Sequence, residues 1–535
     1  MKGSSLKTIF AILIIILILW AIYNNMLKED KVSIITEQVD YEKKGTIISN
    51  NIRIGIVEFD NINPILSNNK NVQDISRLIF DPLFNLNQDY RLEGILANEC
   101  SKINETTYIV KLKEKIRWHD GNKFDASDVI FTIDMLKKIG TESVYYYNVK
   151  DISEIDEIDE YTIKIKVDRE IPYYEYNFIF PIVSSKYFNE ENFYLESKNT
   201  KPVGTGMFYI SETENNTILL KKSINELKDK IVKLDTITLQ LYNSLSSEIN
   251  GFTEGEIDIF TSSNKNIEEY LKNTSHNQIE YINRNYQYIG LNCTDSVLAN
   301  SEVRQAINSA INKEEIIKEV YNNKYYISNF PLDFGSFAYD SNNTVMAYDA
   351  NTAKGLLVDN GWKYSSKRWR KTVNYRYLKI ELDLVVNKKN VNLVKIGNKI
   401  KEQLNIVGII VNLKEVSESQ YNSCLENKNY DMIICESTYG YSPSLEKYFG
   451  ENNLANYYNE EIKALLKEAE LSNNDNEIKQ KYTRITEIYN NDVPYISLAF
   501  NQNTMIYSPN LKGNIKPNSY NLFYNIETWY REYTK

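Results

Sequence analysis

Residue types that carry covalent chemistry are sparse in this chain, and none falls in a catalytic pattern. Only two histidines occur, His119 and His276, which argues against a histidine-based metal site or a histidine-dependent mechanism. No Gly-x-Ser-x-Gly or His-Glu-x-x-His motif is present. Acidic pairs such as Asp156 and Asp159 lie in a charged strand-turn segment, which is typical of a solvated face. The sequence therefore favours binding over bond-making, and we expect no enzyme activity, no cofactor and no metal.

Four cysteines and one glycine-rich stretch remain as candidates for chemistry. Cys100, Cys293, Cys424 and Cys435 have no C-x-x-C spacing, which excludes zinc-ribbon and thioredoxin-like motifs. Either Cys424 pairs with Cys435 across a hairpin, or all four are free buried thiols. Gly204-Thr205-Gly206 lacks the Lys-Ser/Thr of a phosphate loop. Its two glycines permit backbone conformations that a side chain would forbid, and we expect the stretch to enter a strand.

The composition indicates packed domains without a nucleic-acid surface. A chain of 535 residues is too long for one core, so two to four globular units are expected. The 42% hydrophobic and 12% aromatic content argue against disorder. The formal charge of −10 comes from acidic and basic residues spread along the chain, so no nucleic-acid partner is expected. Because 42 tyrosines occur, a tyrosine is by itself weak evidence for a ligand site.

The N-terminus predicts a membrane segment. Lys2 and Lys7 precede an apolar run over residues 8–22 that extends to Leu27, about the ~20 residues that a spanning helix needs. The run is either a cleaved signal peptide or an uncleaved anchor, and the lack of small residues at a cleavage site favours the anchor. Since no cysteine follows the run directly, no lipid attachment site is present. The basic residues would stay inside, and the rest of the chain would face out.

The stretch from Leu112 to Leu136, LKEKIRWHDGNKFDASDVIFTIDML, organises the rest of the chain. It predicts the end of a strand, a turn at Asp120-Gly121 and a helix from about Ser127, which would cap it. Trp118 and His119 would form a structural aromatic clamp over the turn. The stretch resembles a pattern in extracytoplasmic solute-binding proteins of the peptide/nickel class, family 5, which feed ABC importers.

Further motifs that resemble this family follow in order, so the resemblance covers about residues 47–535. They are Arg77 to Leu136, Lys201 to Ile210, Gly255 to Ile259, Asn285 to Cys293, Ser301 to Tyr321, Tyr348 to Trp362, Val394 to Leu413 and Asp492 to Leu498. The pattern over 234–260 also predicts a parallel β-α-β unit without the resemblance. Within these motifs we expect Arg304 to be a structural ion-pair partner.

The resemblance implies an α/β, two-lobed periplasmic-binding-protein-like fold of type II, cluster C, after an N-terminal transmembrane helix. The first lobe would carry an extra subdomain. The expected boundaries are 1–27 for the anchor, 28–46 for a tether, 47–75, 181–270 and 490–535 for lobe I, 76–180 for its extra subdomain, and 271–489 for lobe II.

A cleft between the lobes would close on the ligand by hinge motion. In peptide-binding relatives, an aspartate in a Gly-Trp-x-x-Asp-Tyr-x-Asp/Glu-Pro loop holds the peptide's α-amino group. The matching stretch, Tyr430 to Pro443, has Tyr439 or Gly440 at the aspartate's place. Either Glu436 substitutes from another direction, or the ligand has no free amine there, or Glu436 faces solvent. The expected ligand contacts are Asn68, Asn69, Tyr146, Tyr288, Glu436, Ser437, Tyr439 and Tyr441.

The resemblance implies a monomeric substrate-binding component of an ABC importer, with a peptide ligand and permease subunits as partners. It would sit on the surface of a monoderm bacterium. The alternatives are a sensor that presents its ligand to a membrane partner, and a binding protein for a non-peptide solute such as a nickel chelate. The missing nucleophile motifs disfavour a hydrolase.

We predict that the apolar N-terminal segment is retained in the mature protein, because a cleavage site is missing after it. N-terminal sequencing of protein isolated from its native membrane should begin within residues 1–23. A mature N-terminus after Tyr23 would show that the segment is a cleaved signal peptide.

Overall fold

The computed structural model describes residues 46–57, 59–214, 216–223, 231–341, 347–373 and 375–534. The predicted anchor and nearly all of the predicted tether lie outside these residues. None of the helices within the described ranges combines the length and the apolar character that a bilayer span requires.

The two ends of the described chain pair with each other. Strand β1 (Thr46–Ser49) runs antiparallel to β23 (Tyr530–Thr534), with Thr46 opposite Thr534. Residues 46–49 and 531–534 form a compact unit separate from residues 50–530. The alternation of apolar and polar residues over 47–59 predicts a single strand. This prediction is wrong, because the strand divides at Asn50, after which β2 (Asn51–Val57) joins the central sheet.

Within residues 50–530, one eleven-stranded sheet is continuous. Its order is β19-β18-β20-β13-β21-β12-β2-β11-β10-β9, with β14 also on β21. The long strands β13 (Asn277–Leu291) and β21 (Tyr495–Tyr507) are antiparallel, with Asn277 opposite Tyr507 and Gly290 opposite Tyr495. At one end they join β12, and at the other β20. Residues 285–291 of the motif over 285–293 thus lie in a strand that crosses between the two parts of the sheet.

The first lobe surrounds the β12-to-β9 part of this sheet. Both β11 and β12 pair parallel with β2, which confirms the predicted β-α-β unit and places β2 between its strands. The remaining elements are α2 (Lys70–Ile79), α5 (Glu196–Asn199), β9 (Phe208–Glu214), β10 (Thr217–Lys222), β11 (Thr236–Tyr242), α6 (Leu245–Thr253), β12 (Ile259–Ser262), α7 (Ile267–Tyr270), β22 (Leu511–Lys512) and η3 (Ile526–Thr528).

A second, four-stranded sheet has the order β5-β6-β8-β7 and lies within residues 76–180, the range predicted for the extra subdomain, whose boundaries stay a prediction. One apolar core runs from the first-lobe strands into this sheet, since Ile54, Val110 and Trp529 belong to the same buried cluster. The elements are β3 (Phe84–Leu86), β4 (Leu92–Gly94), β5 (Ala97–Asn104), β6 (Thr107–Leu112), α3 (Ala126–Ile139), η1 (Gly140–Glu142), α4 (Tyr146–Val149), β7 (Ile152–Asp159), β8 (Thr162–Val167) and η2 (Tyr174–Ile179).

The Leu112–Leu136 stretch is structural, as expected, but its cap differs. Helix α3 begins at Ala126, and Asp125, not Ser127, caps it in a capping box with Asp128. Asp128 is fully buried, and its Oδ2 accepts a hydrogen bond from Trp118 Nε1 at 3.0 Å. Burial raises the pKa of Asp128, although hydrogen bonds from Trp118 and Ser185 lower it. Trp118 is thus held by the helix it precedes.

His119 ties the turn to the Gly-Thr-Gly stretch. Its Nε2 lies 2.9 Å from the Gly206 carbonyl, and the Gly204 N–H donates to its Nδ1 at 3.3 Å. A Cβ at either glycine would collide with the Ile79 carbonyl at the end of α2. Neither glycine has a positive φ, so they are needed for close approach, not for a special backbone conformation. The stretch leads into β9, which confirms the expected strand entrance.

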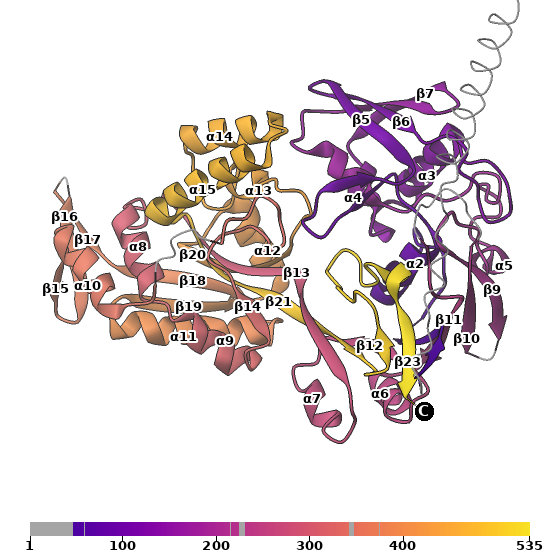
Figure 1. Cartoon of the computed structure of the whole chain (residues 1–535). Helices are drawn as coiled ribbons and strands as arrows, with labels where there is room; N and C mark the ends of the chain where they lie inside the picture. The colour runs from indigo at the N-terminus through magenta and orange to yellow at the C-terminus, as the bar shows by residue number, and fades with distance from the viewer. Residues whose placement is uncertain are drawn as a thin grey trace, which may run out of the picture. The chain divides into compact units, whose positions relative to one another are not determined.

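The second lobe has a core on each face of its strands, and Figure 1 shows α9 and α11 on one side with α12 and α15 on the other. Its elements are α8 (Ser301–Ser309), α9 (Lys313–Tyr321), β14 (Tyr325–Ile327), α10 (Ala350–Asp359), β15 (Lys363–Ser365), β16 (Arg368–Val373), β17 (Arg376–Lys379), β18 (Glu381–Asn387), α11 (Val391–Ile406), β19 (Ile410–Val416), α12 (Glu418–Asn427), β20 (Met432–Thr438), α13 (Glu446–Phe449), α14 (Glu460–Leu471) and α15 (Asp475–Asp492).

Two details of the second lobe refine the sequence expectations. Arg304 is buried, and its guanidinium donates to the carbonyls of Asp492 (2.7 Å) and Leu298 (2.6 Å). The expected ion pair is not found among the described residues, because these backbone carbonyls take the guanidinium instead. All four cysteines are free, and only Cys435 is fully buried.

Glu248 supplies a test of the first lobe. Its carboxyl lies against β2 at Gly55 and is 4% exposed, and burial raises its pKa to about 8. In the unfolded chain the Glu248 carboxyl ionises near pH 4.5, whereas in the folded protein it stays protonated up to about pH 8. The free energy of unfolding therefore falls as pH rises from about 4.5 to about 8. We predict that Glu248→Gln raises the free energy of unfolding at pH 8 by on the order of 2 kcal/mol and has little effect at pH 4.5.

The measurement is urea denaturation of variant and parent at both pH values. Glu254→Gln, an exposed position beside the same helix, is the control and should change neither value. Equal effects of Glu248→Gln at the two pH values would contradict the assignment.

Candidate ligand-binding site

Three tyrosines from distant segments meet where the two lobes touch. Tyr441 follows β20, Tyr90 lies in the turn between β3 and β4, and Tyr520 lies in the C-terminal segment. The Tyr441 ring centroid is 5.6 Å from that of Tyr90 and 5.1 Å from that of Tyr520. The Tyr441 hydroxyl also donates to the Ser519 carbonyl at 2.7 Å. These residues, with Arg77, Arg284 and Asp333, are called the interlobe cluster.

Two guanidinium groups lie on these rings. Arg77 Cζ in α2 is 3.7 Å from the Tyr520 ring centroid, and Arg284 Cζ in β13 is 4.0 Å from that of Tyr441. Within the described residues, neither arginine has a carboxylate oxygen within 4 Å, whereas Arg91 pairs with Asp475. Stacking on an aromatic face favours a cation but leaves the edges of the guanidinium free to donate hydrogen bonds.

An irregularity in the crossing strand places Arg284. The register between β13 and β21 shifts between Ile282 and Tyr286, so Arg284 is not paired with β21. Instead its carbonyl accepts from the Tyr439 N–H at 2.8 Å, and its Nε donates to the Tyr439 carbonyl at 2.5 Å. Bulges of this kind re-aim side chains beside functional sites. The bulge therefore directs Arg284 away from β21 and onto the segment that follows β20.

Asp333 is a carboxylate that sequence reasoning missed. It is 6% exposed and accepts from the Gly335 N–H at 2.8 Å. Burial raises its pKa to about 6, against the Gly335 hydrogen bond and the charge of Arg284. Burial, with the charge of Asp333 contributing, also raises the pKa of Tyr90 and Tyr439. In the sequence Asp333 is only one acid in a loop, and no motif marks it.

The first-lobe residues predicted as ligand contacts lie outside this cluster. Asn69 caps α2, its side chain accepting from the Asn71 N–H at 2.8 Å, and Asn68 beside it is exposed. Tyr146 begins α4 and lies edge-on to Tyr147. These assignments stay predictions.

The residues predicted as ligand contacts in the second lobe lie on both faces of the sheet formed by β13 and β20. Tyr288 is 4% exposed and stacks on Tyr286 in the lobe core. Tyr439 is buried too, and its hydroxyl donates to the Pro331 carbonyl at 2.7 Å. Glu436 is exposed and accepts from Gln287 Nε2 at 2.6 Å on the α9 face, the face opposite Tyr439.

Ser437 belongs to the Tyr439 face of β20, one residue beyond Glu436, and is half-buried. Tyr441 is thus the one predicted contact whose side chain joins the interlobe cluster.

A second set of contacts joins the extra subdomain to α14. Lys102 Nζ lies 2.9 Å from Glu470 and 3.2 Å from Glu170, and Lys467 pairs with both acids. Nearby, the Phe337 N–H donates to the Asp89 carbonyl at 2.9 Å. Ion pairs and one backbone hydrogen bond thus hold the lobes together beside the cluster.

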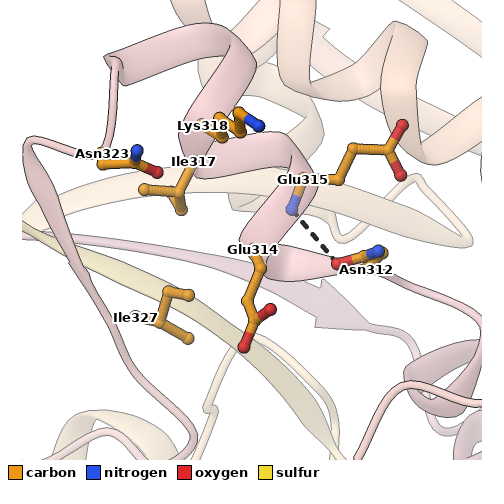
Figure 2. Close-up of a pocket in the computed structure, with 7 residues that line it drawn as sticks. All are labelled: Asn312, Glu314, Glu315, Ile317, Lys318, Asn323 and Ile327. Atoms are coloured by element: carbon orange, nitrogen blue, oxygen red, sulfur yellow. Dashed lines mark hydrogen bonds between the residues drawn. The ribbon is translucent and has the colours of Figure 1, made fainter.

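A separate pocket of about 550 Å³ lies on the second lobe. Figure 2 shows the residues that line it. Its lining comes from α9 and the segment that follows, so it does not involve the interlobe cluster. In it, Asn312 Oδ1 accepts from the Glu315 N–H at 3.1 Å as the cap of α9. Its lining residues are Asn312, Glu314, Glu315, Ile317, Lys318, Asn323 and Ile327.

Comparison with known proteins agrees with this two-lobed arrangement. The model of the family described as "Bacterial extracellular solute-binding proteins, family 5 Middle" matches residues 92–449, more than half of the chain. The chain belongs to this family. Family 5 solute-binding proteins are binding proteins, which fits the lack of a catalytic motif. The oligopeptide-binding protein AppA of Bacillus subtilis (strain 168) is 23% identical over 498 residues, 88% of this chain and 89% of AppA.

Solved structures of similar fold cover almost the whole chain. The periplasmic murein tripeptide-binding protein MppA, in its unliganded open form, has a TM-score of 0.76 at 18% identity, with 92% of this chain and 99% of MppA covered. NikZ from Campylobacter jejuni, in complex with Ni(L-His), has a TM-score of 0.59 at 20% identity, with 91% and 100% covered. These likenesses support the two-lobed fold of the family 5 solute-binding proteins.

We predict that Tyr441→Phe weakens lobe contact in the ligand-free protein, because it removes the hydrogen bond to Ser519. A net loss of about 1 kcal/mol would raise the ratio of open to closed molecules about fivefold. Single-molecule energy transfer between dyes on the two lobes measures this ratio. Tyr458→Phe, at an exposed tyrosine of the second lobe, is the control. An unchanged ratio for Tyr441→Phe would contradict a role in closure.

Proposed function

We propose that this family 5 solute-binding protein is the substrate-binding component of an ABC importer, and that it binds peptides between its lobes. It would hold the peptide at the interlobe cluster and deliver it to permease subunits in the membrane. The observation that carries the proposal is the pair of crossing strands, β13 and β21, with aromatic rings, two guanidinium groups and a buried carboxylate where the lobes touch. Peptides carry both charges and a backbone that such groups recognise.

The apolar run of residues 8–27 supports a membrane tether that leaves the binding lobes outside the cell, as a monomer beside its permease. It accords with a family of extracellular binding proteins.

We further propose that Asp333 receives the α-amino group of the peptide. In the peptide-binding proteins that this chain resembles, an aspartate has this role, and this chain has Tyr439 or Gly440 at the matching position. Asp333 lies close enough to Tyr439 for its charge to raise the pKa of that phenol, after burial as the main cause. Glu436, the candidate from sequence, points to the opposite face of β20. Asp333, a carboxylate from a different segment, would thus bind the peptide amine in place of the family's aspartate.

The test is native mass spectrometry of the full chain with a mixed peptide library, with the same peptides N-acetylated, and with a nickel–histidine chelate. We expect free-amine peptides to bind at least about tenfold more tightly than acetylated ones, the value of one charged hydrogen bond. Asp333→Asn should abolish that difference, and Glu436→Gln should leave it intact. Because the pKa of Asp333 is about 6, the preference should fade below pH 6.

The outcomes separate the parts of the proposal. If Glu436→Gln, and not Asp333→Asn, removes the preference, the carboxylate is assigned wrongly while peptide binding stands. Binding of the nickel chelate with no bound peptide would show that the ligand class is wrong.

A further inference from the structure

A strongly basic surface lies on the second lobe and has no part in the proposed function. Strands β15, β16 and β17 form a three-stranded antiparallel sheet over residues 363–379, called here the basic meander, and Figure 1 shows it beside α10. It carries seven basic residues and no acidic one, in a chain whose formal charge is −10. They are Lys363, Lys367, Arg368, Arg370, Lys371, Arg376 and Lys379.

The strand register aligns three of these cations in one row. Lys363 is directly opposite Arg370, and Arg370 is directly opposite Lys379. Like charges opposite each other destabilise a sheet. Within the described residues, the compensating acid is Glu381, whose Oε2 lies 2.7 Å from Lys379 Nζ and 3.7 Å from Arg368 Nη1. One carboxylate cannot balance this face, so the row costs stability that an external anion would restore.

The meander is fixed to the lobe by its other face, so the row points outward. Trp369 is 4% exposed, and its Nε1 donates to the Val407 carbonyl at 2.8 Å. Tyr364 packs on Trp369 with ring centroids 5.1 Å apart. Lys363 and Lys379 are exposed. A rigid support with an outward cationic row is the geometry of a docking surface for a flat anionic partner.

Exposed tyrosines accompany the cations. Tyr375, in the turn between β16 and β17, is fully exposed, and Tyr377 is 62% exposed. Phenol rings are amphipathic and are enriched at the level of lipid headgroups. Basic residues near an anionic bilayer contribute about 1 kcal/mol each. We propose that the basic meander binds the anionic phospholipid headgroups of a bilayer.

The observations favour a bilayer over a soluble polyanion. The apolar run of residues 8–27 predicts that the chain is attached to a membrane. Single-stranded nucleic acids, by contrast, are held in grooves where aromatic rings stack on successive bases. Here Tyr375 lies in a turn, and Tyr377 lies on the exposed β17 strand. This inference does not depend on the nature of the solute bound between the lobes.

The test is hydrogen–deuterium exchange of the full chain added to preformed vesicles, either pure phosphatidylcholine or with about 30% phosphatidylglycerol. We expect exchange over residues 363–379 to slow at least about threefold with phosphatidylglycerol and to recover in about 0.5 M NaCl. The triple variant Lys363→Gln/Arg370→Gln/Lys379→Gln should lose this protection. The control Lys388→Gln/Lys395→Gln/Lys401→Gln removes three exposed charges elsewhere on the lobe and should keep it.

A parallel sample contains phosphatidylcholine vesicles and a single-stranded oligonucleotide. Equal exchange with the two lipid compositions would overturn the proposal. So would equal protection of the triple variant, because the row would then not be the contact. Protection by the oligonucleotide, without protection by phosphatidylglycerol, would assign the meander to a soluble polyanion instead.

Discussion

The hydrogen-bonded pair of β13 and β21 is the constraint on which the rest of the body depends. Both strands continue from one lobe into the other, so every element on either side takes its place from their register. Because side chains alternate across a sheet, that register decides which face each residue of β13 and its partner β20 presents. Tyr286 and Tyr288 therefore enter one core of the second lobe, while Gln287 and Glu436 turn to the other face.

The pairing of β13 and β21 is interrupted at a bulge, and this bulge places the charged Arg284 at the lobe contact. At the bulge after Ile282, the strand leaves β21 and Arg284 bonds instead to the backbone of Tyr439. Half-buried guanidinium groups with no carboxylate partner among the described residues are costly, and stacking on Tyr441 and Tyr520 offsets only part of this cost. Asp333 is the converse case, a carboxylate with a raised pKa beside them. Such unbalanced groups are typical of binding sites rather than of cores.

Charge is also unbalanced at the basic meander, but for a different physical reason. In the interlobe cluster the cost arises from burial, whereas in the meander it arises from repulsion between exposed cations fixed in register. Buried polar groups are satisfied only by partners placed at hydrogen-bonding distance. An exposed, flat row suits an extended charged surface.

Much of the fold could be read from the sequence, because local rules governed it. The alternation of apolar residues marked the strands, and the helix start at Asp349 and the stops at Gly361 and Gly408 followed capping chemistry. Residue type could not decide which residue caps α3, because Asp125 and Ser127 lie close together and both are favoured caps. The division of the first strand at Asn50 was also missed, because it depends on pairing with the far C-terminus.

The sequence by itself determined the family, the order of elements and the absence of a catalytic motif, since these depend on contiguous patterns. Only the tertiary structure decided the site. Arg77, Arg284, Asp333 and Tyr520 meet through contacts between segments hundreds of residues apart, and a strand bulge sets the direction of one of them. The charged row of the meander was equally hidden, because Lys363, Arg370 and Lys379 are aligned only when the three strands pair in this register.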